Sequence, residues 1–439
     1  MTVKQEVLDL VKSRYKELFP PTKFVPGETY INPAGAYFDK DEVLSLLDAT
    51  LSFAITNQLG LVQKFEKEIA RYLGVRCASM CNSGSSANLL AISALTSPLL
   101  GSRALQPGDE IITVAAGFPT TVNPILQIGC VPVFVDINLP TYNTSPFLVS
   151  NAITEKTKAV IIAHTLGNPF DVESIKQLCV ENNLWLIEDC CDVLGGEWEG
   201  KKCGTFGDLS TLSLYPAHHI TAGEGGVVFT DSPLLNKIVN SFREWGRDCW
   251  CAPGKDNTCG KRFGHTDKGT LPEGYDHKYT YSHIGYNLKA TDLQASIALA
   301  QLKRLPELIA DRRENWEYLR AGLDDLDKYF ILPDYSPKAN PSWFGFVLSV
   351  RNDTKFTRNE FVQWLDENKI GTRNLFGGNL TRQPAYIGKN WRIADEEAGL
   401  PHSDFVMQNT AWIAVHPLLS GKMLDYMIDK IHQFVREYE

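Results

Sequence analysis

The stretch LWLIED at residues 184–189 combines four apolar side chains with two carboxylates at its end. Three similar runs precede it, DEIITV at 109–114, VPVFVD at 131–136 and AVIIAH at 159–164. Short apolar runs of this kind are typical of strands that a parallel sheet buries on both faces. Connecting segments, several of helix length, separate the runs. The pattern therefore predicts an α/β protein with a doubly wound sheet.

Asp189 ends the last of these runs and is followed by two cysteines. In doubly wound sheets, ligands bind in the crevice beyond the carboxyl ends of the strands. Polar residues at the ends of the predicted strands are therefore the first candidates for a functional site.

The order of the patterns predicts three parts in a chain of 439 residues, which is long for one core. Residues 1–35 read as an amphipathic helix followed by an extended arm. Residues 36–300 are predicted to form a large domain, with a cysteine-rich, irregular stretch at 236–285. Residues 301–439 are predicted to form a smaller C-terminal α+β domain. A connection as long as 236–285 is usually functional.

Composition excludes several classes of protein. The formal net charge is −9 and no basic stripe is present, which argues against nucleic acid as a partner. No apolar run is long enough to predict a membrane span, and the charged N-terminal segment does not read as a signal peptide. We therefore expect a cytoplasmic protein whose ten cysteines are thiols or metal ligands.

A turn of small residues, NSGSSANLLAI at 82–92, runs into a predicted helix. Its free backbone N–H groups and the positive end of the helix could bind a phosphate. Alone, the motif is equally an ordinary helix cap.

Three further motifs follow in order: AGFPTT at 116–121, LIEDCCD at 186–192 and SLYPAHHITAGEGG at 213–226. Together with the turn at 82–92, this set resembles the fold-type-I, vitamin B6-dependent sugar aminotransferase family over nearly the whole chain. The resemblance implies a mixed, mostly parallel sheet and places the B6 cofactor in the large domain.

The resemblance also assigns roles to single residues. It implies that Gly84, Ser85 and Ser213 bind the cofactor phosphate, that Phe118 stacks on the pyridine ring, and that Asp189 contacts the ring nitrogen. A carboxylate there keeps the ring protonated and makes it an electron sink.

Asn287, in GYNLKATD at 285–292, matches a family position that reaches the phosphate of the neighbouring subunit. The resemblance therefore implies a homodimer.

His218 occupies the position at which family aminotransferases carry the lysine that binds pyridoxal phosphate covalently. Imidazole cannot form that bond, so we expect pyridoxamine 5'-phosphate, bound without a covalent link. Imidazole can still transfer protons near neutral pH. The alternative is a surface histidine, and the adjacent His219 is the better candidate for a spectator.

Within the superfamily, a histidine at this position resembles the 3-dehydrases of deoxysugar biosynthesis. In these enzymes the cofactor amine condenses with a 4-ketohexose, a base removes a proton, and the hydroxyl at sugar carbon 3 leaves. The resemblance implies that His218 is this base, and Asp192 is a candidate to assist it.

Four cysteines, Cys191, Cys249, Cys251 and Cys259, combine a strand end with the irregular stretch. Thiolates can bind an iron–sulfur cluster or zinc, and the spacing alone does not decide between them, although it fits the paired hairpins of structural zinc poorly. Cys190 is expected to point the opposite way from Cys191.

The cysteine pattern resembles that of the iron–sulfur 3-dehydrases that act on CDP-linked 4-keto-6-deoxyglucose. Three sequence segments share this resemblance: WGRDCWCAPG at 245–254, YTYSHIGYNLK at 279–289 and GNLTRQP at 378–384. The resemblance implies a 2Fe-2S cluster, an NADH-dependent flavin and iron–sulfur reductase as partner, and a place in 3,6-dideoxyhexose and O-antigen lipopolysaccharide biosynthesis.

Candidates for binding the nucleotide sugar are Arg373, Arg382 and Lys289, although surface ion pairs would explain each of them equally well. CDP as the nucleotide rests on overall similarity.

Three other functions remain open. One is a cluster-free 3-dehydrase that takes its amine from an amino acid, another is a nucleotide-sugar aminotransferase, and the third is a catalytically silent relative that binds structural zinc.

Overall fold

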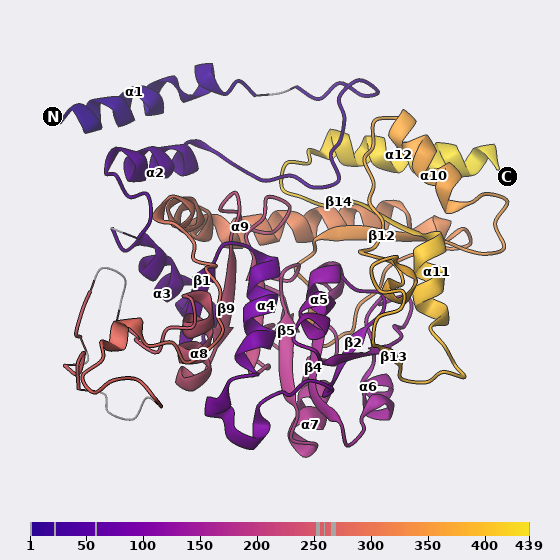
Figure 1. Ribbon diagram of the computed structural model, residues 1–439. Coiled ribbons are helices and arrows are strands. Elements are labelled where there is room, and N and C mark those ends of the chain that lie inside the picture. Colours follow the sequence, from indigo (N-terminus) through magenta and orange to yellow (C-terminus); the bar gives the residue numbers. More distant parts are fainter. Residues whose placement is uncertain are drawn as a thin grey trace.

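The computed structural model describes residues 2–21, 23–57, 59–251, 255–258, 260–264 and 269–438. Across these residues, eight strands form one sheet in the order β1-β9-β8-β5-β4-β2-β3-β13 (Figure 1). β9 is antiparallel to both of its neighbours, and the other adjacent pairs are parallel. The predicted α/β fold with a mixed, mostly parallel sheet is confirmed. The strands are β1 Cys77–Cys81, β2 Glu110–Val114, β3 Val131–Val135, β4 Thr157–Ala163, β5 Trp185–Asp189, β8 Leu209–Ser213, β9 Gly226–Thr230 and β13 Arg392–Ile393.

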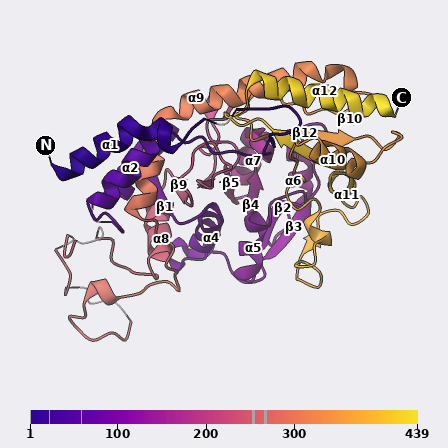
Figure 2. The ribbon, with the colours of Figure 1, turned by 90° about the horizontal axis from the view of Figure 1, so that it is seen from above.

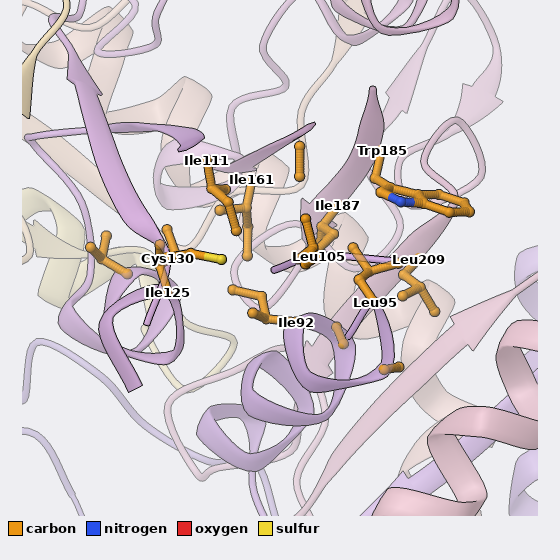
Figure 3. Close-up of a cluster of buried hydrophobic side chains, with 14 of the residues drawn as sticks. Ile92, Leu95, Leu105, Ile111, Ile125, Cys130, Ile161, Trp185, Ile187 and Leu209 are labelled. Carbon is orange, nitrogen blue, oxygen red and sulfur yellow. The ribbon is translucent and has the colours of Figure 1, made fainter. Parts of the chain in front are cut away.

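Helices cover both faces of this sheet because successive strand residues point to opposite sides. Ile111, Ile161 and Ile187 face one core, and Ile112 and Ile162 face the other. Figure 3 shows Ile92 and Ile125, which come from two helices, lying among side chains of the strands. The layers consist of α4 Gly84–Ala94, α5 Pro119–Gln127 and α8 Pro233–Arg243 on one face, and α6 Pro146–Ala152 and α7 Val172–Glu181 on the other.

The N-terminal helices lie along one side of the molecule with a long helix, α9 Asp292–Gly322 (Figure 2). Thr291 begins α9 with a capping box to Gln294, which satisfies free donors of the first turn. The boundary predicted at residue 300 falls inside α9, so the division into domains stays a prediction. The remaining helices here are α1 Val3–Leu18, α2 Lys40–Leu51 and α3 Leu61–Leu73.

The C-terminal part contains a separate antiparallel sheet in the order β10-β12-β14. Its core includes Phe346, Phe361 and Phe434, all buried. Its elements are β10 Phe330–Ile331, β12 Gly345–Val350, α10 Arg358–Glu367, α11 Pro401–Asn409, β14 Thr410–Ala414 and α12 Gly421–Glu437. A small third sheet links the two parts through β11 Ala339–Asn340, β6 Glu197–Trp198 and β7 Lys201–Lys202.

The stretch predicted to be irregular begins later than expected. α8 continues to Arg243, so residues 236–243 are helical. Leu235, Ile238, Val239 and Phe242 are buried on one face, a helical spacing that the prediction missed.

Between α8 and α9, the described residues extend outward from the molecule on the side of α8 (Figures 1 and 2). The short 3-10 turns of the chain are η1 Pro98–Arg103, η2 Thr165–Gly167, η3 His277–Tyr279, η4 Asp324–Leu326 and η5 Leu380–Arg382. No helix in the described ranges is both long and apolar enough to cross a membrane.

Candidate cofactor and sugar site

A cavity of about 590 Å³ opens where β4, β5 and β8 end, between the large sheet and the C-terminal part. This is the position that the doubly wound topology predicts. Most of the residues singled out in the sequence line it, and they come from five separate segments. They are Gly84, Ser85, Phe118, Asp189, Cys191, Asp192, Ser213, His218 and Arg373.

Asp189 is held by a network of hydrogen bonds at the bottom of the cavity. Its Oδ2 accepts from Asn88 Nδ2 at 2.8 Å and from Thr121 Oγ1 at 2.7 Å, and its Oδ1 accepts from the Cys191 amide at 3.1 Å. Thr211 in turn donates to the Asn88 amide oxygen at 2.6 Å. The carboxylate is therefore fixed in place before any ligand binds, as a partner for a pyridine nitrogen must be.

The start of α4 and the end of β8 approach each other closely enough to form a cradle. A Cβ added to Gly84 would lie 2.5 Å from the Ser213 Cβ, so only glycine allows this approach. Ser83 caps the helix, and the Ser85 hydroxyl donates to Thr120 Oγ1 at 3.0 Å. Amides of a first helical turn with hydroxyls beside them are the donor set that a phosphate needs.

Phe118 precedes α5 and leaves about half of its surface, 49%, exposed beside the cavity. Its ring meets the ring of Phe376 edge to face at 6.2 Å. An aromatic face open to a cavity can stack on a planar ring.

His218 also lines the cavity, in contact with Asp192. Nδ1 of His218 is 3.3 Å from Oδ1 of Asp192, and the His218 ring centre is 5.2 Å from that of Phe344. The contact is not aligned as a hydrogen bond in this structure. Burial raises the pKa of Asp192 above its ordinary value, and His218 opposes the rise. Of the described residues that line the cavity, none is a lysine.

His219 points away from this wall. Its Nε2 lies 3.0 Å from the carbonyl oxygen of Ser342, and burial lowers its pKa well below the ordinary value. The structure thus places His219 in the core beside the cavity, which fits the interpretation of His219 as a spectator.

Only one of the three candidates for nucleotide binding reaches the cavity. Arg373 lines it, whereas Arg382 pairs with Asp404 at 2.9 Å. The Lys289 ammonium lies 3.3 Å from the Trp245 ring centre and donates to Asn287 Oδ1 at 2.7 Å. Neither Lys289 nor Asn287 lines the cavity of its own chain.

The described cysteines of the predicted set lie in two places. Cys191 lines the cavity, while Cys249 and Cys251 line a separate small pocket beside His277. Cys259 lies outside the described residues. Among the described residues, Cys191, Cys249 and Cys251 do not form one group of ligand atoms within 4.8 Å of one another.

Cys190 packs in a buried apolar cluster, whereas Cys191 lines the cavity, although β5 ends at Asp189 and the strand does not continue through the two cysteines. The Cys190 thiol, His164 and Glu188 bring their ligand atoms within 4.8 Å of one another. However, the Glu188 carboxylate already accepts from three backbone amides and contacts His164 at 3.2 Å. This group is therefore a buried structural network. The three amides belong to Gly204, Phe206 and Gly207.

The cavity fits a B6 cofactor in its chemistry. It offers a phosphate cradle at Gly84 and Ser213, an exposed aromatic face at Phe118 and a fixed carboxylate at Asp189.

Two residues that hold Asp189 escaped the sequence analysis. Asn88 lies one helical turn after Gly84 on α4, and Thr121 on α5 lies three residues after Phe118, which caps that helix. Their spacing could have indicated them, because positions three or four apart share a helix face.

Comparison with known proteins identifies the family. A profile of the DegT/DnrJ/EryC1/StrS aminotransferase family matches residues 38–432. The chain therefore belongs to this family.

Two relatives at about half identity span almost the whole chain. The lipopolysaccharide biosynthesis protein RfbH of Salmonella typhimurium is 50% identical over 432 residues, which is 98% of each chain. The dTDP-4-dehydro-2,6-dideoxy-D-glucose 3-dehydratase of Saccharopolyspora spinosa is 51% identical over 432 residues, 98% of this chain and 92% of the relative.

A solved structure of similar fold is that of E. coli GDP-4-keto-6-deoxy-D-mannose-3-dehydratase with bound hydrated PLP. It superposes with a TM-score of 0.80 at 28% identity, covering 92% of this chain and 100% of that one.

Proposed function

We propose that this member of the DegT/DnrJ/EryC1/StrS family removes the carbon-3 hydroxyl of a nucleotide-linked 4-keto-6-deoxyhexose, with pyridoxamine 5'-phosphate bound non-covalently. The observation that carries the proposal is His218 on the cavity wall, where none of the described lining residues is a lysine. Two relatives are named as sugar 3-dehydratases, which supports the same reaction.

The residues of the cavity would hold the cofactor by its two ends. Gly84, Ser85 and Ser213 would bind the phosphate, Phe118 would stack on the ring, and Asp189 would hold the ring nitrogen in its protonated form. When bound, the cofactor supplies an amine for the sugar carbonyl and a ring that withdraws electrons.

His218 would take the proton from the cofactor methylene. Its contact with Asp192 is through Nδ1, so Nε2 lies on the other side of the ring. Because imidazole titrates near neutral pH, it can accept a proton and return one to the leaving hydroxyl. Asp192 would orient the ring and stabilise its charged form.

Arg373 is proposed to bind the nucleotide diphosphate, since it is the arginine among the described lining residues. CDP as the nucleotide remains a proposal, based on the similarity of the sequence motifs.

We further propose that Cys191, Cys249, Cys251 and Cys259 would hold a 2Fe-2S cluster, which would supply one-electron transfer from an NADH-dependent reductase. The cysteine spacing supports this proposal. The described thiols lie in two pockets, so cluster binding would have to bring them together.

Finally, we propose a homodimer in the cytoplasm, in which Asn287 serves the neighbouring subunit. The side chain of Asn287 does not line the cavity of its own chain, which supports this role.

The test is anaerobic purification followed by incubation with CDP-4-keto-6-deoxyglucose, pyridoxamine phosphate, NADH and the reductase. A brown protein with two irons per chain and a 3-deoxy product would support the full proposal. A 3-deoxy product without metal would leave the cluster-free dehydrase, and an amino sugar would indicate the aminotransferase. Zinc without turnover would indicate the silent relative.

Cys191 and Cys190 provide a matched pair for the cluster, because they are adjacent and only Cys191 lines the cavity. Cys191→Ser should lose the iron, whereas Cys190→Ser should keep it. Equal iron in both variants would exclude Cys191 as a ligand.

A further inference from the structure

Arg312 is a buried cation behind the wall that carries His218. It lies on α9, and only 1% of its surface is exposed. A guanidinium is costly to bury unless its donors are satisfied, so its partners indicate what it stabilises.

The guanidinium of Arg312 links two segments of the cavity wall. Nη2 donates to the carbonyl oxygens of Ala217 at 3.2 Å and His218 at 3.3 Å. Nη1 donates to the carbonyl oxygen of Trp343 at 3.2 Å. The arginine therefore ties the histidine turn to the segment that leads into β12. That segment carries Phe344, whose ring packs against His218.

We propose that Arg312 is a positioning residue for the proton transfer, which fixes the turn that carries His218 at the cavity wall. This inference rests on the proposed role of His218.

The neighbouring Arg313 offers a matched control. It lies on the same helix and also binds backbone carbonyls, those of Pro341 at 2.7 Å and Gly195 at 3.3 Å. Among the described residues, the hydrogen bonds of Arg313 go to carbonyl oxygens outside the His218 turn. Arg313 variants therefore report the general cost of removing a carbonyl-bound arginine from α9.

The experiment compares Arg312→Met, Arg312→Lys and Arg313→Met in the full-length protein. Two quantities are measured: amide hydrogen exchange of the peptide that covers residues 214–222, and the rate of hydrogen exchange at the cofactor methylene with sugar present, separated into kcat and KM for the sugar. Cofactor binding and thermal unfolding report whether each variant folds.

For Arg312→Met, we expect faster amide exchange in residues 214–222 and a loss of about 100-fold in kcat, the scale of a displaced reacting group, with KM unchanged. Arg312→Lys keeps the charge but not the planar fork of donors, so kcat should fall by about tenfold. Arg313→Met should change neither quantity.

The inference is overturned if Arg312→Met retains the wild-type kcat and amide exchange, or if Arg313→Met changes both in the same way. If Arg312→Met does not fold, Arg312→Lys decides: wild-type rate and amide exchange in that variant reject the inference. If the wild type exchanges methylene hydrogen but forms no 3-deoxy sugar, the proposed function fails while the Arg312 comparison still stands.

Discussion

The cavity around Asp189 and the stretch that carries Cys249 and Cys251 are stabilised in different ways. Asp189 is buried and receives hydrogen bonds from Asn88 and Thr121 at 2.8 and 2.7 Å. The described part of the cysteine stretch includes ion pairs near the surface, such as Arg262 with Asp276 at 2.6 Å.

The difference matters because ion pairs near the surface contribute little to stability, whereas a buried network tolerates few alternatives. Aromatic side chains of the stretch are also exposed, including Trp250 at 54% and Tyr281 at 53%. We infer that the cavity is organised by the chain alone, while the geometry of the cysteines depends on what binds there. The following predictions test this contrast.

Replacing His218 with Asn should have the largest effect. The amide keeps a polar side chain of similar reach but cannot accept a proton, so dehydration should fall by about two to four orders of magnitude. Pyridoxamine phosphate should still bind, which its absorbance spectrum can show. Dehydration at the wild-type rate would exclude His218 as the base.

Gly84→Ala should weaken cofactor binding without stopping the chemistry of the bound fraction. The new methyl group would lie 2.5 Å from the Ser213 Cβ, an overlap that costs about 1–3 kcal/mol, or roughly 5- to 150-fold in the dissociation constant. Cofactor titration measures the change.

The control for Gly84→Ala is Gly421→Ala, at the first residue of α12, where an added Cβ meets nothing within 4 Å. Equal cofactor affinity in both variants would show that the Gly84 cradle does not hold the phosphate.

The contrast between the regions also explains what the sequence could predict. Runs such as 109–114 and 184–189 indicated strands because burial on both faces leaves a continuous apolar run, and these became β2 and β5. Asp189 was found because it ends a predicted strand, and Ser213 and His218 were found because their motif resembles that of the family; all three line one cavity.

Sequence reasoning failed where contacts join distant segments. Arg312 lies far along the chain from His218 and looks like an ordinary charge on a helix, although only the folded structure brings it to the carbonyls of Ala217 and His218. For Arg382 the sequence left a ligand and a surface ion pair open, and in the structure it pairs with Asp404.

Asp192→Asn should have a smaller effect than the first two changes and should alter the pH profile. Burial raises the pKa of Asp192, so its carboxylate becomes protonated at a pH above the ordinary aspartate range. Once protonated, Asp192 no longer supports His218. The wild-type rate should therefore fall on the acid side in that range. At neutral pH the variant should lose roughly fivefold in rate, about 1 kcal/mol, because a neutral amide no longer stabilises the charged imidazole, and it should lose that part of the acid limb.

The pH dependence of Asp192→Asn is measured by the rate of methylene hydrogen exchange. An unchanged acid limb in the variant would assign that limb to another group.

Cys251→Ser should have the smallest effect on the cavity. If the cavity is organised without the cysteine stretch, loss of this thiol leaves the Asp189 network and His218 unchanged, so the rate of methylene hydrogen exchange with the sugar should stay within about twofold of wild type, less than 0.5 kcal/mol. Iron content should fall, because serine oxygen is a poor ligand for iron–sulfur centres, and the 3-deoxy product should not form with NADH and the reductase. Cys179→Ser, at a buried thiol of α7, is the control and should retain both iron and product. A folded Cys251→Ser protein that loses even the hydrogen exchange would show that the cysteine stretch shapes the sugar site, and full turnover without iron would show that electrons reach the sugar by another route.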